Sequence, residues 1–437
     1  MQNAPAKFGP VHLESGTSTS NVWALMYMAF VTIGLVTGMA AMTPYVLTAN
    51  LGIAEDAQGR ALGNLALWQE ITLIIAYGPI GLLADRIGRK AVYAAGFITL
   101  ALGYAIYPYA SSITELSMAR VIYSLGIGAM TGMLATVIAD YSVEADRGKL
   151  TAICGFLNGL GVVLVALFIG KLPAIFVARG ATDIAAGQQT MLVAAAFCLI
   201  SAAVAWLFLR PGVPAATASK PRRPALETLR EGFLVARTNK RIALSYVSGF
   251  VARGDIAIVG LFAIAWGKQA AIADGLSASA ALSAGLVPFI VAQSAALMWP
   301  AVIAVPLDRM PRMAALGWCM ALGLVGYCCL ILVDDPLQAA ALPFFALLGI
   351  GQISAFLAAQ TIIGKEAPED MRGSVIGVFN LCGAVGILIL SVIGGWLFDK
   401  VGPWAPFFLV GLLNGVVAIG AFWIKRQEDA SAAPDAI

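Results

Sequence analysis

The sequence predicts an all-α membrane protein with twelve membrane-spanning helices, and two observations carry this prediction. Of the 437 residues, 60% are hydrophobic and only 12% are charged, whereas soluble globular domains carry about 25% charged residues. The apolar residues also gather in runs that are long enough to cross a bilayer, which takes about 20 helical residues. Because lipid offers no hydrogen-bond partner to a free backbone, these runs are expected to be helices.

Twelve apolar runs follow one another along the chain. Their length favours helices over the strands of a membrane barrel, which are short and alternate between apolar and polar residues. The predicted spans are 22–48, 62–83, 91–110, 117–140, 150–171, 190–210, 242–267, 278–304, 313–333, 337–363, 373–397 and 403–424.

The longest polar stretch lies between the sixth and seventh runs. Residues 211–241 contain seven Lys and Arg residues and are expected to link two six-helix bundles. The predicted domains are therefore residues 1–210, the linker 211–241, and residues 242–437 with a short tail. Within the linker, residues 225–235 have the pattern of a short amphipathic helix on the membrane surface.

The distribution of basic residues predicts the orientation of the chain. Of 27 Lys and Arg residues, 20 fall on the side that holds the linker and both termini, five fall on the other side, and two lie inside helices. Basic loops stay on the cytoplasmic side, so we expect both termini and the linker to be cytoplasmic, in a bacterial-type inner membrane. The first 20 residues carry no cleavable signal pattern, so the first run is expected to be kept as a helix.

Composition argues against an enzyme, a metal site and a nucleic-acid partner. The only histidine, His12, lies in the polar N-terminal segment, and the six cysteines lie within apolar runs without metal-site spacing. Neither a zinc site nor a Ser-His-Asp triad is supported. The net charge of +3 is small, and no basic cluster alternates with aromatic residues as in a nucleic-acid groove. We expect no cofactor.

The loop between the second and third runs reads G-L-L-A-D-R-I-G-R-K. Glycine at its start allows two helices to approach closely, the aspartate can pair with a basic group, and the basic residues hold the loop at the membrane interface. These features suit a gate. The residues concerned are Gly81, Asp85, Arg86, Gly88, Arg89 and Lys90.

A degenerate copy of this loop closes the eighth run, with Asp308, Arg309 and Arg312. Alanine and proline replace its two glycines, so close packing is less assured there. A second pair of similar loops, E-A-D-R-G and E-D-M-R-G, covers residues 144–148 and 369–373. Asp85 and Asp308 are 223 residues apart, and Arg147 and Arg372 are 225 apart. Matching offsets predict two homologous halves, and Asp140, Arg147 and Arg372 are expected to form a charge relay at their cytoplasmic ends.

The first loop resembles the signature of the major facilitator superfamily, G-x-L-x-D-R-x-G-R-K, at every defined position. The resemblance extends over the whole chain through the helix count, the linker and the duplicated loop. It implies two pseudo-symmetric six-helix bundles that rock about a substrate site near mid-membrane. It also implies secondary transport by alternating access, with the Asp85 and Asp308 loops latching the cytoplasmic side.

The fourth run is similar to another motif of this family. It begins near Arg120 and reads R-V-I-Y-S-L-G-I-G, against the family pattern R-x-x-q-G-x-G. Tyr123 and Ser124 depart from that pattern. The fifth run lacks the Gly-Pro element typical of the family's antiporters, which lowers the expectation of drug–proton antiport.

Four charged residues inside the predicted helices are candidate functional groups, because charge there is costly unless it is paired or hydrated. Glu70 is about 12 Å from the outer end of its run, and Arg253 and Asp255 are about 18–20 Å deep. The last two point about 200° apart, so one is expected to face the cavity and the other a neighbouring helix. Glu70 or Asp255 would carry a coupling proton, and Arg120 or Arg253 would attract an anionic substrate group. Static pairing that fixes helix packing stays open for all four.

Neutral polar residues within the helices form a second group of candidates. Gln293 and Gln352 are favoured for substrate contacts, because the eighth and tenth helices border the cavity in relatives. Hydrogen bonding between helices is the alternative for all of them. The group comprises Asn158, Gln293, Gln352, Gln360 and Asn380. Four aromatic residues are candidates for the substrate path or for interfacial anchors: Tyr27, Tyr45, Trp266 and Trp299.

The sequence favours a proton-coupled secondary transporter of a small organic solute, expected to be a monomer in the bilayer. A proton-driven exporter of drugs or amphiphiles is the alternative, which Glu70 and the apolar wall fit. A sensor or assembly factor that has lost transport is a third reading, against which the intact loop argues. No run carries a sugar, peptide, nitrate or phosphate signature that identifies the substrate.

Overall fold

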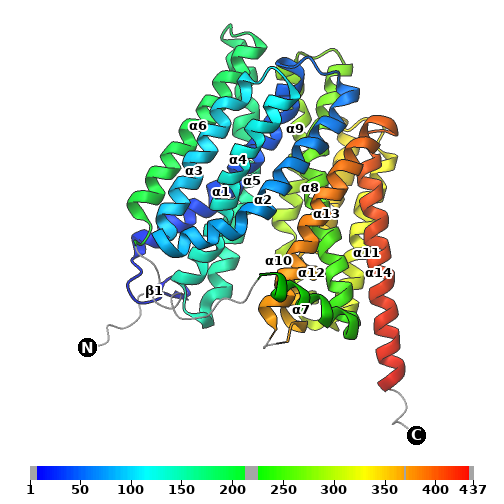
Figure 1. Cartoon of the computed structure of the whole chain (residues 1–437). Coiled ribbons are helices and arrows are strands. Elements are labelled where there is room, and N and C mark those ends of the chain that lie inside the picture. The colour runs from blue at the N-terminus through cyan, green and yellow to red at the C-terminus, as the bar shows by residue number, and fades with distance from the viewer. Residues whose placement is uncertain (1–6, 212–224, 369–370, 433–437) are drawn as a thin grey trace. The chain divides into compact units, whose positions relative to one another are not determined.

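The computed structural model describes residues 7–211, 225–368 and 371–432. Helices make up nearly all of this part of the chain (Figure 1). Twelve of the described helices are long and apolar enough to cross a membrane. The predicted all-α fold with twelve spanning helices is confirmed.

The chain divides into two compact units. Unit 1 comprises Met1–Glu55, Trp68–Lys220 and Asp274–Leu286, and unit 2 comprises Asp56–Leu67, Pro221–Ala273 and Val287–Ile437. The two units therefore exchange two short segments relative to the predicted domains 1–210 and 242–437, whose boundaries stay a prediction.

Unit 1 contains most of the first half of the chain; residues 56–67, with the start of its second helix, belong to unit 2. A two-residue hairpin of β1 (Lys7–Phe8) and β2 (Val11–His12) precedes the helices. The helices are α1 (Thr19–Ala49), α2 (Gln58–Ile87), α3 (Arg89–Ile106), α4 (Ile113–Tyr141), α5 (Arg147–Ala178) and α6 (Asp183–Phe208).

Small residues set the spacing of the helices in unit 1. Helix α1 packs along α5, and α3 packs along α4 and α6. A Cβ placed on Gly161 of α5 would lie 1.8 Å from the carbonyl oxygen of Phe30 on α1. Because lipid does not drive apolar helices together, this close backbone approach is what allows the two helices to pack.

Unit 2 contains most of the second half of the chain; residues 274–286, with the start of one helix, belong to unit 1. The helices are α7 (Ala225–Thr238), α8 (Lys240–Ala273), α9 (Ala278–Met298), α10 (Pro300–Arg309), α11 (Arg312–Cys328), α12 (Leu342–Glu366), α13 (Arg372–Lys400) and α14 (Ala405–Ala432). The predicted eighth span corresponds to α9 and α10, which are separate helices because Pro300 cannot donate a backbone hydrogen bond.

The helices of unit 2 pack by the same rule. Helix α8 lies along α13, and α11 lies along α12 and α14. A Cβ on Gly386 of α13 would lie 2.1 Å from the carbonyl oxygen of Phe250 on α8. Helix α7 packs on α13, and the hydroxyl of Tyr246 donates a 2.8 Å hydrogen bond to the carbonyl of Gly232 in α7. The predicted helix in the linker is therefore present.

Each unit has one end that collects most of its loop lysines and arginines. In unit 1 this end holds the α2–α3 and α4–α5 loops, and in unit 2 it holds the α10–α11 and α12–α13 loops. We call these the basic ends, and we call the other end of each unit the opposite end. Lys268 directly follows the predicted span 242–267, but it lies within α8 and is fully buried.

Candidate functional site: charges at the helix ends and inside the helices

The loop between α2 and α3 is organised by one buried arginine. Arg89 is 8% exposed. Its Nη1 lies 3.0 Å from Oδ1 of Asp85, and its Nε lies 3.1 Å from Oδ2 of Asp140 on α4. Gly88 directly before it has φ +94°, which residues with a Cβ rarely adopt. Arg89 thus joins the ends of α2 and α4 through two carboxylates, and Gly88 allows the turn that places it.

The other residues of this loop lie at the surface of unit 1. Arg86 is exposed, and the ammonium of Lys90 lies 5.3 Å from the ring centroid of Trp206 on α6. A Cβ on Gly81 would meet no heavy atom of the described chain within 4 Å. The close helix approach expected at Gly81 therefore has no partner within unit 1.

The α4–α5 loop is held by Asp146. This carboxylate is 4% exposed, and its Oδ2 accepts a 2.8 Å hydrogen bond from the backbone N–H of His12. The Nδ1 of His12 lies 2.5 Å from the same oxygen, and the Nζ of Lys149 lies 2.6 Å from Oδ1. Arg147 is exposed, and no ion pair joins it to a described residue. Asp140 thus takes part in an ion pair, while the relay role of Arg147 stays a prediction.

At the basic end of unit 2, Asp308 and Arg309 are exposed, and neither makes an ion pair within the described ranges. Arg312 instead pairs with Glu366 at the end of α12, with 2.7 Å between Nη1 and Oε1. Arg372 is also exposed, so its relay role stays a prediction. Glu369 and Asp370, which complete that repeated loop, lie outside the described residues.

Arg241 completes the network at this end. Its Nη1 lies 3.0 Å from Oε1 of Glu366, and its Nε lies 2.7 Å from Oε1 of Glu428 on α14. One arginine therefore joins the start of α8 to the ends of α12 and α14. Arg89 in unit 1 likewise contacts two carboxylates. The two arginines do not hold equivalent positions in the sequence repeat.

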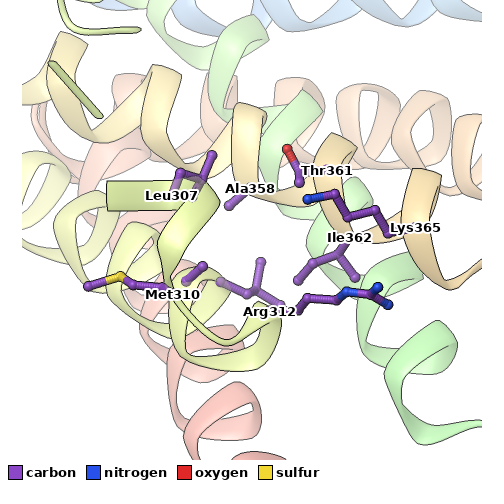
Figure 2. A pocket seen from close by; sticks show the side chains of 9 residues that line it. Leu307, Met310, Arg312, Ala358, Thr361, Ile362 and Lys365 are labelled. Atoms are coloured by element: carbon purple, nitrogen blue, oxygen red, sulfur yellow. The ribbon is translucent and has the colours of Figure 1, made fainter. Parts of the chain in front are cut away.

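A small cavity lies beside Arg312. Figure 2 shows the side chains of Leu307, Ile362 and Lys365 around it. Its volume is about 20 Å³, which is room for about one water molecule. The cavity therefore does not hold an organic substrate.

Two predicted charged residues are buried in unit 1. Glu70 on α2 is 5% exposed, and Arg120 on α4 is 3% exposed. The guanidinium carbon of Arg120 lies 5.2 Å from the ring centroid of Tyr123, a cation–π distance. The Nε and Nη1 atoms of Arg120 have no hydrogen-bond partner among the described residues. Arg120 is thus a buried cation with free donors, next to an aromatic ring.

Asp255 is fully buried in unit 2 between α8 and α14. Its Oδ2 accepts a 3.3 Å hydrogen bond from Nδ2 of Asn414, and its Oδ1 has no partner within the described chain. The buried hydroxyl of Tyr327 on α11 is also without a partner there. Arg253 does not pair with Asp255, and a Cβ on Gly383 of α13 would lie 2.2 Å from Cδ of Arg253. The two charges therefore lie against different helices, and the expectation that one of them faces a substrate cavity stays a prediction.

The predicted neutral residues have mixed surroundings. The Nε2 of Gln293 lies 3.4 Å from Oε1 of Gln352, so these two candidates contact each other across α9 and α12. Asn158 is half-buried with a partnerless Oδ1, and Asn380 is exposed. Their substrate roles stay predictions.

Three of the four predicted aromatic residues make a hydrogen bond through the polar atom of the side chain. The hydroxyl of Tyr27 lies 3.0 Å from Oγ of Ser201, and that of Tyr45 donates to the carbonyl of Asp183 at 2.7 Å. The indole N–H of Trp299 donates to Ser354 at 2.8 Å. Trp266 packs against the rings of Phe345 and Phe407. These contacts favour a role of the four residues in helix packing within each unit, and their role in a substrate path stays a prediction.

The larger described cavity has a different character. It measures about 510 Å³ and is lined by Phe30 of α1, residues of α5 and residues of α6. All eight lining residues are apolar: Phe30, Leu164, Val165, Phe168, Val193, Ala196, Phe197 and Ile200. A groove without a polar group can accept a hydrocarbon chain but cannot orient a polar solute.

Comparison with known proteins identifies the family. Residues 24–391 match the family model described as Major Facilitator Superfamily, with a second match over residues 308–436. The chain belongs to the major facilitator superfamily. The resemblance indicated by the loop motif is thereby confirmed, and the chain is a membrane transporter by family and fold.

Relatives that match over most of this chain share a little more than a quarter of its residues. The chain is 28% identical over 418 residues to the magnetosome protein MamH of Paramagnetospirillum magneticum, covering 93% of this chain and 92% of MamH. It is 26% identical to the magnetosome protein MamZ of Magnetospirillum gryphiswaldense, covering 96% of this chain. The match covers 63% of MamZ, so this chain spans about three fifths of that protein.

Solved structures share the fold. The nucleoside transporter NupG superposes with a TM-score of 0.72 at 14% identity, covering 93% of this chain and 98% of NupG. A D-xylose–proton symporter superposes with a TM-score of 0.67 at 17% identity, covering 92% and 97%. At these identities the likeness establishes the fold alone.

Proposed function

We propose that this protein is a secondary active transporter that moves a small organic solute by alternating access and is driven by a proton gradient. The observation that carries the proton coupling is Asp255. It is a fully buried carboxyl group, and its only described hydrogen-bond donor is an amide of Asn414.

A carboxylate in this position is costly as an ion. A lone charge in the membrane interior costs at least about 2.5–3.5 kcal/mol, and no described cation pairs with Asp255. The neutral acid avoids this cost because it holds a proton. Opening of the surrounding helices to water would reverse the preference, which is what a proton carrier in a transport cycle requires.

Glu70 is the second candidate for a coupling carboxylate. It is 5% exposed on α2 in the other unit. A D-xylose–proton symporter with the same fold supports the idea that this fold can run on protons. The proposed partners are therefore a small organic substrate, protons and the lipid bilayer, with the chain acting as a monomer.

The proposed location is a bacterial inner membrane, with the basic ends and both termini on the cytoplasmic side. Its support is the distribution of Lys and Arg, 20 of 27 on one side. Basic loops resist translocation, and the ion pairs of Arg89 and Arg241 lie at these ends.

A second candidate function is the export of amphipathic compounds. The observation that favours it is the apolar groove of about 510 Å³ among α1, α5 and α6. Such a groove could take up a hydrocarbon chain from the bilayer. The absence of the Gly-Pro element from α5 counts against this candidate.

The test uses purified protein in two steps. A thermal-shift screen against a metabolite library first identifies a ligand, and that ligand is then followed in proteoliposomes with an imposed pH gradient. We expect accumulation against the ligand's own gradient that a protonophore abolishes. Dye efflux without metabolite uptake would favour the exporter, and tight binding without counterflow would contradict transport.

A further inference from the structure

Asn414 on α14 donates a hydrogen bond to the buried carboxyl group of Asp255. Its Nδ2 lies 3.3 Å from Oδ2 of Asp255 and 3.0 Å from the carbonyl oxygen of Val410, one turn earlier on α14. An amide nitrogen carries two hydrogens, so both are engaged. Asn414 is itself fully buried, and water therefore does not compete for these two bonds.

The bond to Val410 fixes the orientation of this amide. A backbone carbonyl oxygen only accepts hydrogen bonds, so a flipped amide would set two oxygens against each other. Helix α11 passes close on the side of the amide oxygen, where a Cβ on Gly323 would lie 2.8 Å from Oδ1 of Asn414. Asn414 thus presents a donor, rather than an acceptor, to Oδ2 of Asp255.

This donor determines where a proton on Asp255 sits. In a neutral carboxylic acid one oxygen carries the proton, and the other is a carbonyl oxygen that accepts hydrogen bonds. Because Oδ2 accepts the bond from Asn414, the proton belongs on Oδ1. Oδ1 has no hydrogen-bond partner among the described residues, so the proton is held at the side of the carboxyl group from which it can leave.

The other titratable groups around Asp255 act on it less directly. Arg253 lies against α13 instead. On α11, the hydroxyl of Tyr327 is within electrostatic reach of Asp255, but a phenol is neutral near pH 7. The other Asp, Glu, Lys and Arg residues of α8, α11, α12, α13 and α14 lie near the ends of these helices. The amide of Asn414 is therefore the side-chain group best placed to distinguish ionised from neutral Asp255.

We propose that Asn414 is a positioning residue for proton coupling, which holds the proton of Asp255 on Oδ1 and sets the pH at which Asp255 releases it. This inference rests on the proposed coupling through Asp255. An N–H bond to a carboxylate is about twice as strong as one to a neutral acid, so the amide favours the ionised form and offsets part of the cost of burial. Without this donor, Asp255 would keep its proton to higher pH.

Infrared difference spectroscopy of the purified protein observes this proton without any substrate. A protonated carboxyl group has a C=O stretching band that a carboxylate lacks, and the part of this band that is missing from Asp255→Asn belongs to Asp255. A titration gives the pH midpoint at which the band disappears. The frequency of the band reports whether the carbonyl oxygen, Oδ2, accepts a hydrogen bond.

Asn414→Leu has nearly the shape of asparagine but donates no hydrogen bond. We expect its midpoint to lie about one pH unit above that of the wild type, and its C=O band to move to higher frequency because Oδ2 has lost its donor. Asn414→Ala, which adds no atom next to Gly323, should shift both in the same direction. Asn380→Leu is the matched control, since Asn380 is exposed on α13 in the same unit, and it should change neither.

An unchanged midpoint in folded Asn414→Leu and Asn414→Ala would overturn the inference, as would a band of Asp255 that is missing from the wild type or does not titrate. A merely structural role of Asn414 would lower thermal stability and leave midpoint and frequency in place. Failure of the proposed function gives a different result. Ligand accumulation at the wild-type level by Asp255→Asn would contradict coupling through Asp255, and with it this role of Asn414, even if the infrared shifts were found.

Discussion

Replacing both carboxylates that contact Arg89 should destabilise the protein by more than the two single replacements together. Asp85→Asn and Asp140→Asn each leave Arg89 one ionised partner, at 3.1 Å and 3.0 Å respectively. In the double variant Arg89, which is 8% exposed, loses both carboxylates and keeps its hydrogen bond to the carbonyl of Ala84.

The magnitudes follow from burial. The side chains of Asp85 and Asp140 are 23% and 26% exposed, so water screens the two ion pairs only in part. Each single replacement removes one charge but keeps an acceptor oxygen, and should cost about 1 kcal/mol. The double replacement removes both of these carboxylates from a buried cation and should cost about 3–5 kcal/mol. The expected coupling is therefore about 1–3 kcal/mol.

The assay is the free energy of unfolding in mixed micelles for the wild type, both single variants and the double variant. Asp308→Asn is the matched control, because Asp308 holds the corresponding position in the repeat but is exposed. It should leave stability unchanged. Additive single effects, to within about 0.5 kcal/mol, would refute the view that Arg89 joins α2 and α4 through both carboxylates.

Three further predictions concern the gate, the helix packing and the orientation. Asp85→Asn should abolish turnover in proteoliposomes while ligand-induced thermal shifts persist, since the loop is predicted to latch the cytoplasmic side; unchanged transport would reduce the loop to a topology signal. Gly161→Ala should cost at least about 1–3 kcal/mol of unfolding free energy because a Cβ there meets the carbonyl of Phe30 at 1.8 Å. Gly155→Ala on the same helix has open space and should be neutral or stabilising, so equal losses in the two variants would contradict the packing account. Cysteines at Ser277 and Ser431, both exposed, should react with impermeant reagents from opposite faces, with Ser431 cytoplasmic; labelling of both from outside intact cells would overturn the orientation.

The sequence was sufficient for the fold because membrane helices leave a simple signal. In lipid, the backbone N–H and C=O groups of a long apolar run can all be hydrogen-bonded within the run only if it forms a helix. The duplicated loops then predicted two halves. The packing of the helix ends was less predictable. Residues 56–67 and 274–286 belong to the other unit from the rest of their half of the sequence, and the pattern of apolar residues along the chain gives no sign of this.

The partners of the charged residues were beyond the sequence for a related reason. Arg89 and Asp140 are 51 residues apart, Asp255 and Asn414 are 159 apart, and Gly59 and Asp399 are 340 apart. Pairing over such separations depends on which helix faces which. The loop motif predicted a gate that includes Asp85 and Arg89. Asp399 lies at the end of an apolar run without any motif around it, so its contacts could not be predicted.

The buried polar partners of Asp255 illustrate the same limit. Asn414 and Tyr327 lie in apolar runs where an isolated amide or hydroxyl usually bonds another helix. Only the packing of α8 with α14 brings Asn414 to the carboxylate. The angular argument predicted only that Arg253 and Asp255 point in different directions, because the geometry of a single helix fixes that; the cavity that one of them was expected to face stays a prediction.

The most direct test of proton coupling is ligand accumulation by Asp255→Asn in proteoliposomes, alongside counterflow of the same ligand. An amide mimics the protonated acid permanently, so counterflow should persist while accumulation driven by the pH gradient disappears. The double variant Arg253→Gln with Asp255→Asn should behave in the same way if it folds. Accumulation on a pH gradient at the wild-type level in either variant would contradict the assignment of Asp255 and leave Glu70 as the remaining candidate.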